Sequence, residues 1–423
     1  MSVVYAAVPE LPLRKKPGGR SSFTTVLMGA WMNVVRDEGM WLLVSAFGET
    51  GWVPRKEVTT ENRYLKIFFI DVGQGDGCLI ETPGRRVLVD GGQYRRNMYN
   101  YLTKYKYRWL IERGERVRLD AVIVSHFDAD HFGGLNYIIG SEHFEIGHVL
   151  HNGIARFSKG RSGRYDSKIG RTVSLNGRGR TRIEPSFSTV DDAKALLSAG
   201  GLMRTFETFL KAVIGANSAG RLQGMRRLAA SDGCVPGFGM RSELPIEVLG
   251  PVAAPRSNGA FPWFKDESHT SNGNSVVLRL WYGDRSFLLG GDLNTPAQEH
   301  LLAHWEAHSF QVDVAKACHH GASEFTTSFL EATQPYATVF SSGDNENYAH
   351  PRADALGCCG RYSRGRRPLV FSTELARSHR GAARIHYGLI NCRSDGERVV
   401  MAQMLEKAKS GDMWDQYELP MDG

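Results

Sequence analysis

Cysteine is scarce in this chain of 423 residues, and long apolar runs are absent from it. The cysteines show no CxxC spacing, which argues against a zinc ribbon and a disulfide scaffold and favours a reducing cytoplasm. No run approaches the roughly 18 to 20 apolar residues of a membrane span. The N-terminus has no basic region followed by an apolar core, so we expect no secretory signal. These absences predict a cytoplasmic protein with no membrane contact.

The composition is that of an ordinary globular protein, with 42% hydrophobic and 23% charged residues. The length exceeds the usual size of one domain, so we expect one large domain and a smaller one. The formal net charge of +7 is compatible with a polyanionic partner, although mildly basic proteins are common.

Residues 1–60 read as short strands separated by turns, with strand candidates at 25–28, 31–35 and 41–44. Strands at this short, regular spacing predict a small β-barrel. The segment resembles a bacterial SH3-type domain at residues 13–17, 39–41 and 51–54. The resemblance implies a module that binds a peptide or another polymer, and hence a possible protein partner. The alternative is a barrel that only packs on the larger domain.

The pattern of short strands and turns ends at about residue 63. The sequence of residues 64–400 predicts a layered α/β domain. Apolar strands are expected at 65–72, 78–81, 86–90 and 121–124, with helical periodicity over 95–113. Further strands are expected at 246–250, 275–280 and 286–292. Each half contains strands that end in glycine followed by a ligand-type residue, as in a duplicated four-layer αββα sandwich. Residues 401–423 are expected to form a polar C-terminal tail.

Four candidate metal ligands follow the strand at 121–124 within six residues: His126, Asp128, Asp130 and His131. Their side chains converge only if the backbone turns sharply, and the glycines at 133 and 134 suit a closely packed turn. Imidazoles and carboxylates at this density are typical of a two-metal site that activates water. The alternative is a solvated acidic loop with two incidental histidines.

Other parts of the same site recur downstream. Asp292 follows Gly290 and Gly291 and is the candidate for the carboxylate that bridges two ions. One of His319 and His320 is expected to complete the second metal's ligands, and the sequence leaves open which. His151 is the candidate for the remaining imidazole. We therefore expect two divalent metal ions, Zn²⁺ or Mn²⁺.

These segments resemble the metallo-β-lactamase superfamily, and most closely the hydrolase domains of ComEC-like DNA-uptake proteins. The resemblance covers residues 65–155 and 270–380 and is carried by residues 71–76, 89–92, 125–135, 272–275, 288–293, 319–321 and 348–351. It implies a metal-dependent hydrolase, with the phosphodiester bonds of DNA as the leading substrate class. The commonest first motif of the superfamily has histidine where this chain has Asp128. A carboxylate there makes a harder ligand set, which favours manganese as well as zinc.

Several residues near these motifs are candidates for roles in catalysis. Asp130 is expected to orient the attacking water or to take its proton. His350 is expected to donate a proton to the leaving oxygen or to contact a phosphate, unless it is an ordinary loop histidine. Lys316 is expected either to contact a phosphate or to be solvated at a strand end. Asp71, Asp76 and Asp90 are interpreted as structural carboxylates of turns or of the ligand surroundings.

A basic insertion is predicted at about 156–240, because this stretch is rich in Gly, Ser and Arg and has few strand signals. Helices are expected only within 190–215. Phe157 and Tyr165 are candidates for stacking on bases. The alternative is a solvated insertion with no ligand. The candidate nucleic-acid contacts are Arg161, Arg164, Lys168, Arg171, Arg178 and Arg180.

The sequence therefore predicts a metal-dependent phosphodiesterase or nuclease that acts on DNA. One rival is a hydrolase of a small ester, lactone or amide, because one fold hosts many chemistries. Another is a non-catalytic protein that contains metal and binds a partner. A third is an enzyme that a partner activates through residues 1–60.

Overall fold

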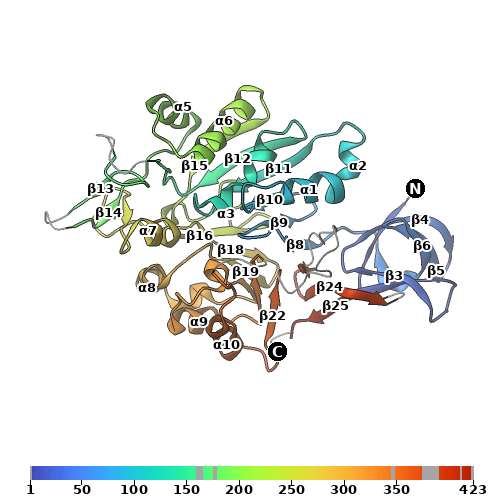
Figure 1. Cartoon of the computed structure of the whole chain (residues 1–423). Coiled ribbons are helices and arrows are strands. Elements are labelled where there is room, and N and C mark those ends of the chain that lie inside the picture. Colours follow the sequence, from blue (N-terminus) through green and yellow to red (C-terminus); the bar gives the residue numbers. More distant parts are fainter. Residues whose placement is uncertain are drawn as a thin grey trace.

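An N-terminal sheet and a larger two-sheet domain make up the chain in the computed structural model (Figure 1). The structure describes residues 2–158, 165–174, 179–343, 348–373, 390–409 and 412–420. The N-terminal part ends with the strand at Val58–Thr59, and the larger domain starts with the strand at Leu65–Phe69. Within the described residues, no helix is long and apolar enough to cross a bilayer.

The N-terminal part is a seven-stranded antiparallel sheet in the order β3-β2-β6-β5-β4-β1-β7. Three of its strands coincide with the stretches expected at 25–28, 31–35 and 41–44. Alternate residues of β2 and β5, among them Leu11, Leu13, Leu42 and Val44, are buried in one small core. Among the described residues, no pairing between the end strands β3 and β7 closes this sheet into a barrel. The strands are β1 (Val3–Ala6), β2 (Glu10–Arg14), β3 (Ser22–Leu27), β4 (Trp31–Glu38), β5 (Trp41–Ala46), β6 (Glu49–Pro54) and β7 (Val58–Thr59).

The first sheet of the larger domain has nine strands in the order β15-β12-β11-β10-β9-β8-β23-β24-β25. Strands β10, β11, β12 and β15 are parallel, and the remaining neighbours are antiparallel. The strands are β8 (Leu65–Phe69), β9 (Cys78–Glu81), β10 (Arg86–Val89), β11 (Val117–Ile123), β12 (Phe144–His151), β15 (Leu222–Arg227), β23 (Ile390–Ser394), β24 (Val399–Lys409) and β25 (Asp412–Glu418).

The second sheet has six strands in the order β16-β18-β19-β20-β21-β22, and its last four strands are parallel. The strands are β16 (Ile246–Gly250), β18 (Val277–Tyr282), β19 (Arg285–Leu289), β20 (Val314–Lys316), β21 (Ala337–Phe340) and β22 (Leu369–Ser372). A small separate sheet joins β13 (Thr172–Val173), β14 (Arg182–Ile183) and β17 (Phe261–Pro262).

Helices cover the outer face of each large sheet. Those on the first sheet are α1 (Asn97–Asn100), a π-helix (Tyr101–Lys106), α2 (Arg108–Ile111), α3 (Ala129–Phe132), α4 (Leu135–Ile139), α5 (Val190–Ala199) and α6 (Arg204–Ser218). The second half of the domain adds α7 (Glu267–Gly273), α8 (Thr295–His304), α9 (Thr327–Thr333) and α10 (Ala353–Arg361). Short 3₁₀ helices lie at Arg55–Glu57, Ala230–Asp232, Ala307–Phe310 and Cys318–Gly321.

Three apolar cores hold these layers together. One core lies between the first sheet and its helices, and a second lies between the two sheets, where Ile67 and Val89 meet Leu278 and Val339. A third lies between the second sheet and helices α8 and α9. The order of layers is therefore α, β, β, α, with helices above and below the sheets in Figure 1.

The C-terminal residues differ from the polar tail expected at 401–423, because residues 399–409 and 412–418 form β24 and β25. The strands extend the first sheet beyond β23, and Val399, Val400 and Met401 are fully buried there. The ring of Tyr417 packs against Phe371 at 6.0 Å. The segment has a polar composition on average. Its few apolar residues are nevertheless placed so that it pairs with β23 at the edge of the first sheet.

The stretch at 156–240 is also more than an added loop. Helices α5 and α6 and strand β15 belong to the first layers of the domain, and Phe206 and Phe209 are fully buried against the first sheet. Only residues around β13 and β14 form a separate extension. Phe157 and Tyr165 stack on each other at 4.0 Å, and Phe157 is buried, so its ring does not face solvent for a base as expected.

The N-terminal sheet packs directly on the larger domain. Met28, Tyr64 and Val400 form a small core between them, and all three are buried. The Arg398 guanidinium donates a hydrogen bond to the Ala7 carbonyl at 3.0 Å. The two parts therefore share an interface that includes the C-terminal hairpin of β24 and β25.

Candidate metal centre

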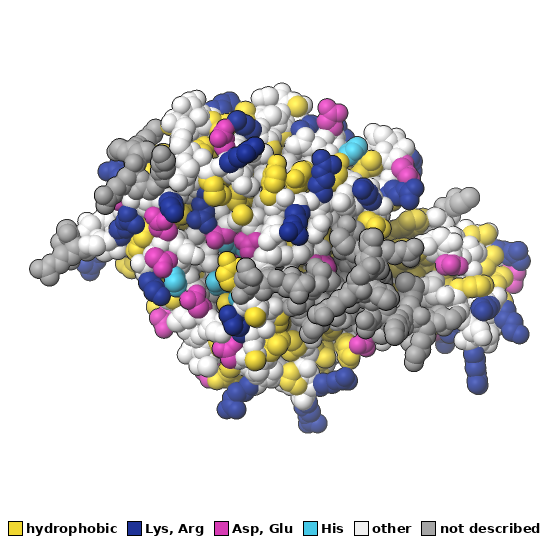
Figure 2. Space-filling view, in the orientation of Figure 1, with side chains coloured by type: hydrophobic (Ala, Val, Ile, Leu, Met, Phe, Trp, Pro, Cys, Tyr) yellow, Lys and Arg dark blue, Asp and Glu magenta, His cyan; other side chains and the backbone are white. Residues whose placement is uncertain are grey.

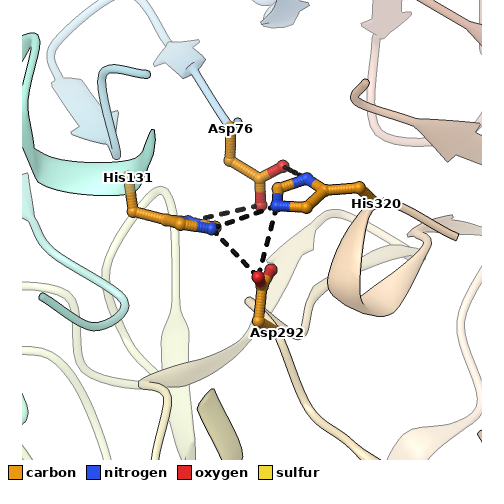
Figure 3. A group of neighbouring side chains, drawn as sticks. All are labelled: Asp76, His131, Asp292 and His320. Atoms are coloured by element: carbon orange, nitrogen blue, oxygen red, sulfur yellow. Dashed lines mark hydrogen bonds and ion pairs between the residues drawn. The ribbon is translucent and has the colours of Figure 1, made fainter. Parts of the chain in front are cut away.

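The loops that follow β8, β11, β19 and β20 meet at one edge of the two large sheets. Parallel strands bring their carboxyl ends to the same edge, so side chains that follow them gather there. Figure 2 shows histidine and acidic side chains on this face, between the upper and lower halves of the molecule and near α7 and α8 in Figure 1. Figure 3 shows four of these side chains, Asp76, His131, Asp292 and His320, pointing toward one another from separate loops.

Asp292 lies at the centre of this cluster. Its Oδ2 atom is 3.1 Å from His131 Nε2 and 3.2 Å from His320 Nε2. The same oxygen is 3.8 Å from His319 Nε2 and 4.0 Å from His126 Nε2. Four imidazoles from two loops therefore direct their Nε2 atoms at one carboxylate, as expected of a group that bridges two ions.

His131 and His320 are each anchored through Nδ1. His131 Nδ1 is 2.9 Å from Asp90 Oδ2, and Asp90 also accepts hydrogen bonds from the Ser125 amide and hydroxyl at 2.8 and 2.6 Å. His320 Nδ1 donates to the Ser341 carbonyl at 2.9 Å. A proton on each Nδ1 leaves Nε2 as the available ligand atom, which is the usual arrangement of metal-binding histidines.

Strained backbone orients several of these side chains. His319 and His320 have φ angles of 49° and 54°, and Asp90 has a φ of 56°. The left-handed region is costly for residues with a side chain and is kept where the surroundings enforce it. Two consecutive left-handed residues bring both imidazoles of the loop within 3.8 Å of Asp292.

Glycines let the ligand loops approach closely. A Cβ on Gly75 would lie 1.7 Å from the Asp130 carbonyl oxygen, and a Cβ on Gly134 would lie 2.0 Å from the Gly91 carbonyl oxygen. The Gly91 amide donates to the His131 carbonyl at 2.7 Å. The segment with Asp130 and His131 is therefore held against two other loops at distances that no side chain permits.

A buried ion pair supports the cluster from below. Lys316 Nζ pairs with Asp76 and donates to the Gly291 carbonyl at 3.0 Å. The other Asp76 oxygen is 3.2 Å from His320 Nδ1. Although burial alone would lower the pKa of the Lys316 amine, Asp76 and Asp292 hold that pKa above its usual value. The amine predicted to meet a phosphate or solvent is thus occupied by carboxylates, and Asp76 contacts imidazoles at their Nδ1 edge.

The imidazoles differ in their affinity for protons. Burial opposes protonation of His320, but Asp292 and Asp76 raise its pKa to about 10. Burial lowers the pKa of His126 well below its usual value, helped by repulsion from His131. Burial likewise lowers the pKa of His319. Asp292 favours protonation of the imidazoles that contact it. Protons would therefore compete with a metal ion for these imidazoles.

The inner residues fit a divalent metal. Donor atoms placed tetrahedrally about 2.0–2.1 Å from zinc lie roughly 3.3 Å apart. The Nε2 atoms of His131 and His320 are 3.3 Å apart, and both are 3.1–3.2 Å from Asp292 Oδ2. Asp130 Oδ2 is 3.6 Å from His320 Nε2 and can provide a further oxygen. His131, His320, Asp292 and Asp130 would hold one ion.

A second group of ligands surrounds His126, whose buried Nε2 has no hydrogen-bond partner among the described residues. This atom is 3.7 Å from Asp128 Oδ1. Asp128 also forms an ion pair with Arg156 and accepts a hydrogen bond from the Ser271 hydroxyl at 2.7 Å. His126, Asp128, Asp292 and His319 would hold a second ion, with Arg156 competing for Asp128.

His151 and His350, the two remaining predicted histidines, have different positions. The His151 ring stacks on Phe187 at 4.2 Å, and its Nδ1 accepts a hydrogen bond from the Gly153 amide. Burial lowers the pKa of His151 to about 3. The structure therefore brings His151 into an aromatic cluster instead of the ligand group. The His350 ring lies 5.9 Å from both His319 and His320, at the rim of the site.

The predicted nucleic-acid contacts lie partly outside the described residues, since Arg161, Arg164 and Arg178 fall there. Lys168 is exposed. Arg171 lies 3.6 Å from Glu184, and Arg180 lies 3.8 Å from Glu267 with its guanidinium 4.9 Å from the Trp263 ring centre.

Sequence reasoning did not single out two residues that contact Asp128. Arg156 was expected only as part of the basic stretch that could follow a phosphate backbone, and Ser271 directly precedes the motif at 272–275. The proximity of Ser271 to that motif was a usable signal. The ion pair between Arg156 and Asp128 depends on how the chain folds between β12 and α5. No feature of the sequence predicts it.

Comparison with known proteins finds a family match that includes the part of this centre at residues 126–131. Residues 70–211 match the family model of the metallo-beta-lactamase superfamily. The chain is 23% identical over 311 residues to ComE operon protein 3 of Bacillus subtilis, which covers 70% of this chain and 31% of that protein. It is also 36% identical over 81 residues to Competence protein ComA of Neisseria gonorrhoeae, covering 19% of this chain and 12% of that protein. The chain thus spans less than a third of these relatives.

A solved structure with the same family name gives a more distant likeness. The metallo-beta-lactamase fold protein YhfI from Bacillus subtilis is 11% identical, with a TM-score of 0.35, and the match covers 73% of this chain and 96% of that chain.

Proposed function

We propose that this chain is a metal-dependent hydrolase that cleaves phosphodiester bonds in DNA, because residues 70–211 match the family model of the metallo-beta-lactamase superfamily. The observation that supports hydrolysis is the group of four Nε2 atoms around Asp292 Oδ2, with Asp130 beside it. Divalent ions held by these residues would lower the pKa of bound water and offset the negative charge on a phosphate.

The chain's own groups carry the proton transfers in this proposal. Asp130 is 26% exposed at its side chain and accepts a hydrogen bond from Gln74 Nε2 at 3.2 Å. Its carboxylate therefore faces both the ligand group and solvent, where it orients the attacking water and takes its proton. His350, at the rim, donates a proton to the leaving oxygen. Lys316 positions Asp76 and Asp292, because its amine lies below the cluster.

The number of basic residues in one stretch of the chain supports an anionic substrate. Arg156, Lys168, Arg171 and Arg180 lie on the stretch between β12 and α5, and the whole chain has a formal net charge of +7. Phosphate backbones are bound mainly through such cationic side chains. One relative is named as a competence protein, which is consistent with a nucleic-acid substrate.

The test is cleavage of end-labelled single- and double-stranded DNA in Mn²⁺ and in Zn²⁺, with lactone and β-lactam substrates in parallel. We expect DNA cleavage that Asp292→Ala abolishes and Asp284→Ala retains, since Asp284 is an exposed aspartate eight positions away. Cleavage of only the small substrates would replace the nuclease proposal by a small-ester, lactone or amide hydrolase. Metal binding without any cleavage would favour a metal-containing binding protein.

We also propose that the N-terminal sheet is an SH3-like module that binds a protein partner. Met40 and Phe47 lie at hairpin turns of this sheet and are each 80% exposed, which is unusual for large apolar side chains. The test is DNA cleavage in buffer and in cell extract by the wild type and by a Met40→Ser, Phe47→Ser variant. Stimulation by extract that this variant loses supports an activating partner, and equal stimulation contradicts it.

A further inference from the structure

A groove separates the N-terminal sheet from the first sheet of the larger domain, on the side of α2 in Figure 1. Its volume is about 540 Å³, which is within the range of small-molecule binding sites. Tyr5 and Trp31 line it from the N-terminal sheet, and Lys66, Arg86 and Lys106 line it from the larger domain. The groove therefore exists only where the two parts of the chain meet.

A row of charges crosses the floor of this groove. Glu81 on β9 pairs in register with Lys66 on β8 and with Arg86 on β10. Lys66 also pairs in register with Arg393 on β23. Lys106, from the π-helix above the sheet, forms an ion pair with Glu81. Glu81 is the one carboxylate among the described residues that line the groove.

Both oxygens of the Glu81 carboxylate already have partners within the protein. Glu81 Oε1 accepts hydrogen bonds from the Tyr107 hydroxyl at 2.6 Å and from Arg86 Nε at 3.4 Å, and its other oxygen contacts Lys106. Among the described residues, the Lys66 amine forms no hydrogen bond or ion pair. Burial, together with the neighbouring charges of Arg393 and Lys106, lowers the pKa of this amine to about 7. Partly buried cations without a counter-charge are costly unless an anion joins them.

Aromatic rings stand at the rim of the same groove. Trp31 and Trp109 are 44% and 47% exposed. The Arg113 guanidinium lies 4.6 Å from the ring centre of Trp109. Exposed tryptophan beside cationic side chains is the combination that binds nucleotides, since bases stack on the rings and phosphates pair with the cations.

We propose that this groove binds a nucleotide unit, with its phosphate on Lys66 and Lys106 and its base against Trp109. The site is separate from the metal centre. It lies where β8 and β10 begin, whereas four of the metal ligands follow the end of β11, which runs parallel to β10. The four residues of β10, about 13 Å, separate the two sites. The proposal does not depend on hydrolysis by the metal centre.

The test is calorimetric titration of chelator-treated protein with inorganic phosphate and with AMP. We expect AMP to bind at least tenfold more tightly than phosphate, because only AMP has a base to stack. Lys66→Met is expected to lower the affinity for both phosphate and AMP at least tenfold. The control Lys211→Met removes one charge from an exposed ion pair on α6 and is expected to bind both ligands like the wild type.

The melting temperature separates a binding role from a structural one. Without ligand, Lys66→Met is expected to melt at or above the wild-type temperature, because it removes repulsion, while AMP no longer raises its melting temperature. Asp292→Ala is expected to bind AMP normally, so failure of the nuclease proposal leaves this one intact.

Trp109→Ala is expected to bind phosphate normally and to lose the preference for AMP. Equal affinity of wild type and Lys66→Met for AMP would overturn the proposal, as would loss of AMP binding in Asp292→Ala. Equal affinity of the wild type for phosphate and AMP would overturn the assignment of a nucleotide.

Discussion

His131 and His320 lie 189 positions apart in the chain, yet their Nε2 atoms are 3.3 Å apart. The first follows a strand of the nine-stranded sheet and the second follows a strand of the six-stranded sheet. Asp90 anchors one ring and the Ser341 carbonyl anchors the other. The pair therefore forms only when the two halves of the domain are docked, and metal affinity reports on that docking.

Asp90→Asn should weaken metal binding without removing a ligand. Asp90 accepts from the Ser125 amide at Oδ1 and from the Ser125 hydroxyl and His131 at Oδ2. Asn has a single acceptor oxygen and no charge, so it cannot keep both sets of contacts, and His131 loses its orientation. We expect a 10- to 100-fold loss of metal affinity, and a loss of about 1–3 kcal/mol in the free energy of unfolding. Titration with Mn²⁺ and urea denaturation measure these quantities.

The control for Asp90 is Asp120→Asn. Asp120 accepts from the Arg86 amide at 2.9 Å and pairs with Arg85 at 3.1 Å, on the same sheet but away from the ligands. It should lose stability and keep its metal affinity. Equal metal affinity in both variants would contradict the anchoring role of Asp90.

Arg156→Met should change metal binding in the opposite direction. Arg156 pairs with Asp128, and burial lowers the pKa of its guanidinium to about 10, which marks a poorly solvated charge. Without Arg156, Asp128 is available to an ion beside His126. We expect lower stability of the metal-free protein and tighter binding of a second Mn²⁺, both followed by calorimetry. Arg180→Met, which removes a charge nearby without contacting Asp128, should show neither effect.

Gly134→Ala and Gly215→Ala should have opposite effects, although both glycines have helical surroundings. A Cβ at Gly134 would lie 2.0 Å from the Gly91 carbonyl oxygen, whereas a Cβ at Gly215 in α6 meets nothing within 4 Å. We expect Gly215→Ala to gain about 0.5–1 kcal/mol in the free energy of unfolding, and Gly134→Ala to lose more than about 2 kcal/mol. Urea denaturation measures both, and a neutral Gly134→Ala would show that the loops separate easily.

Lys66 should give the protein a characteristic pH dependence. Its pKa is about 7 in the folded protein and near 10.5 when unfolded, so the unfolded chain binds more protons between these values. Stability from this group therefore rises with pH from about 7 to 10.5. The groups that face Lys66 are Glu81, Lys106 and Arg393.

Lys66→Met lacks this titration. Its stability advantage over the wild type should be largest below pH 7 and should shrink as the pH approaches 10. Urea denaturation at pH 6, 8 and 9.5 checks this, with Lys211→Met as the control. If the difference in the free energy of unfolding between wild type and Lys66→Met stays constant with pH, the Lys66 amine is well solvated.

Local patterns allowed much of the architecture and most of the ligand candidates to be predicted. Strands that end in glycine and a ligand residue marked Asp292 and the loop at 125–135, because catalytic loops follow the ends of buried strands. The histidines at 319 and 320 are both near Asp292, so the structure leaves both as candidate ligands, as the sequence did.

The remaining features depend on contacts between distant segments. The sequence predicts only that Lys316 lies at the end of a strand. The fold shows that Asp76, far away in sequence, forms an ion pair with it. His151 ends a strand as a ligand should, but Phe187 from a later loop covers its ring. The strands at the C-terminus have a polar composition, and their pairing with β23 is what makes them part of the sheet.

Strand β8 pairs on one side with β9, which follows it closely, and on the other with β23 at Ile390–Ser394. During translation the N-terminal sheet is therefore complete early, while the edge of β8 stays open until β23 has been synthesised. An unpaired edge of this kind is prone to wrong pairing with other chains. An ion held by Asp292 and His320 would bind only after both residues have been synthesised and the two halves of the domain have docked.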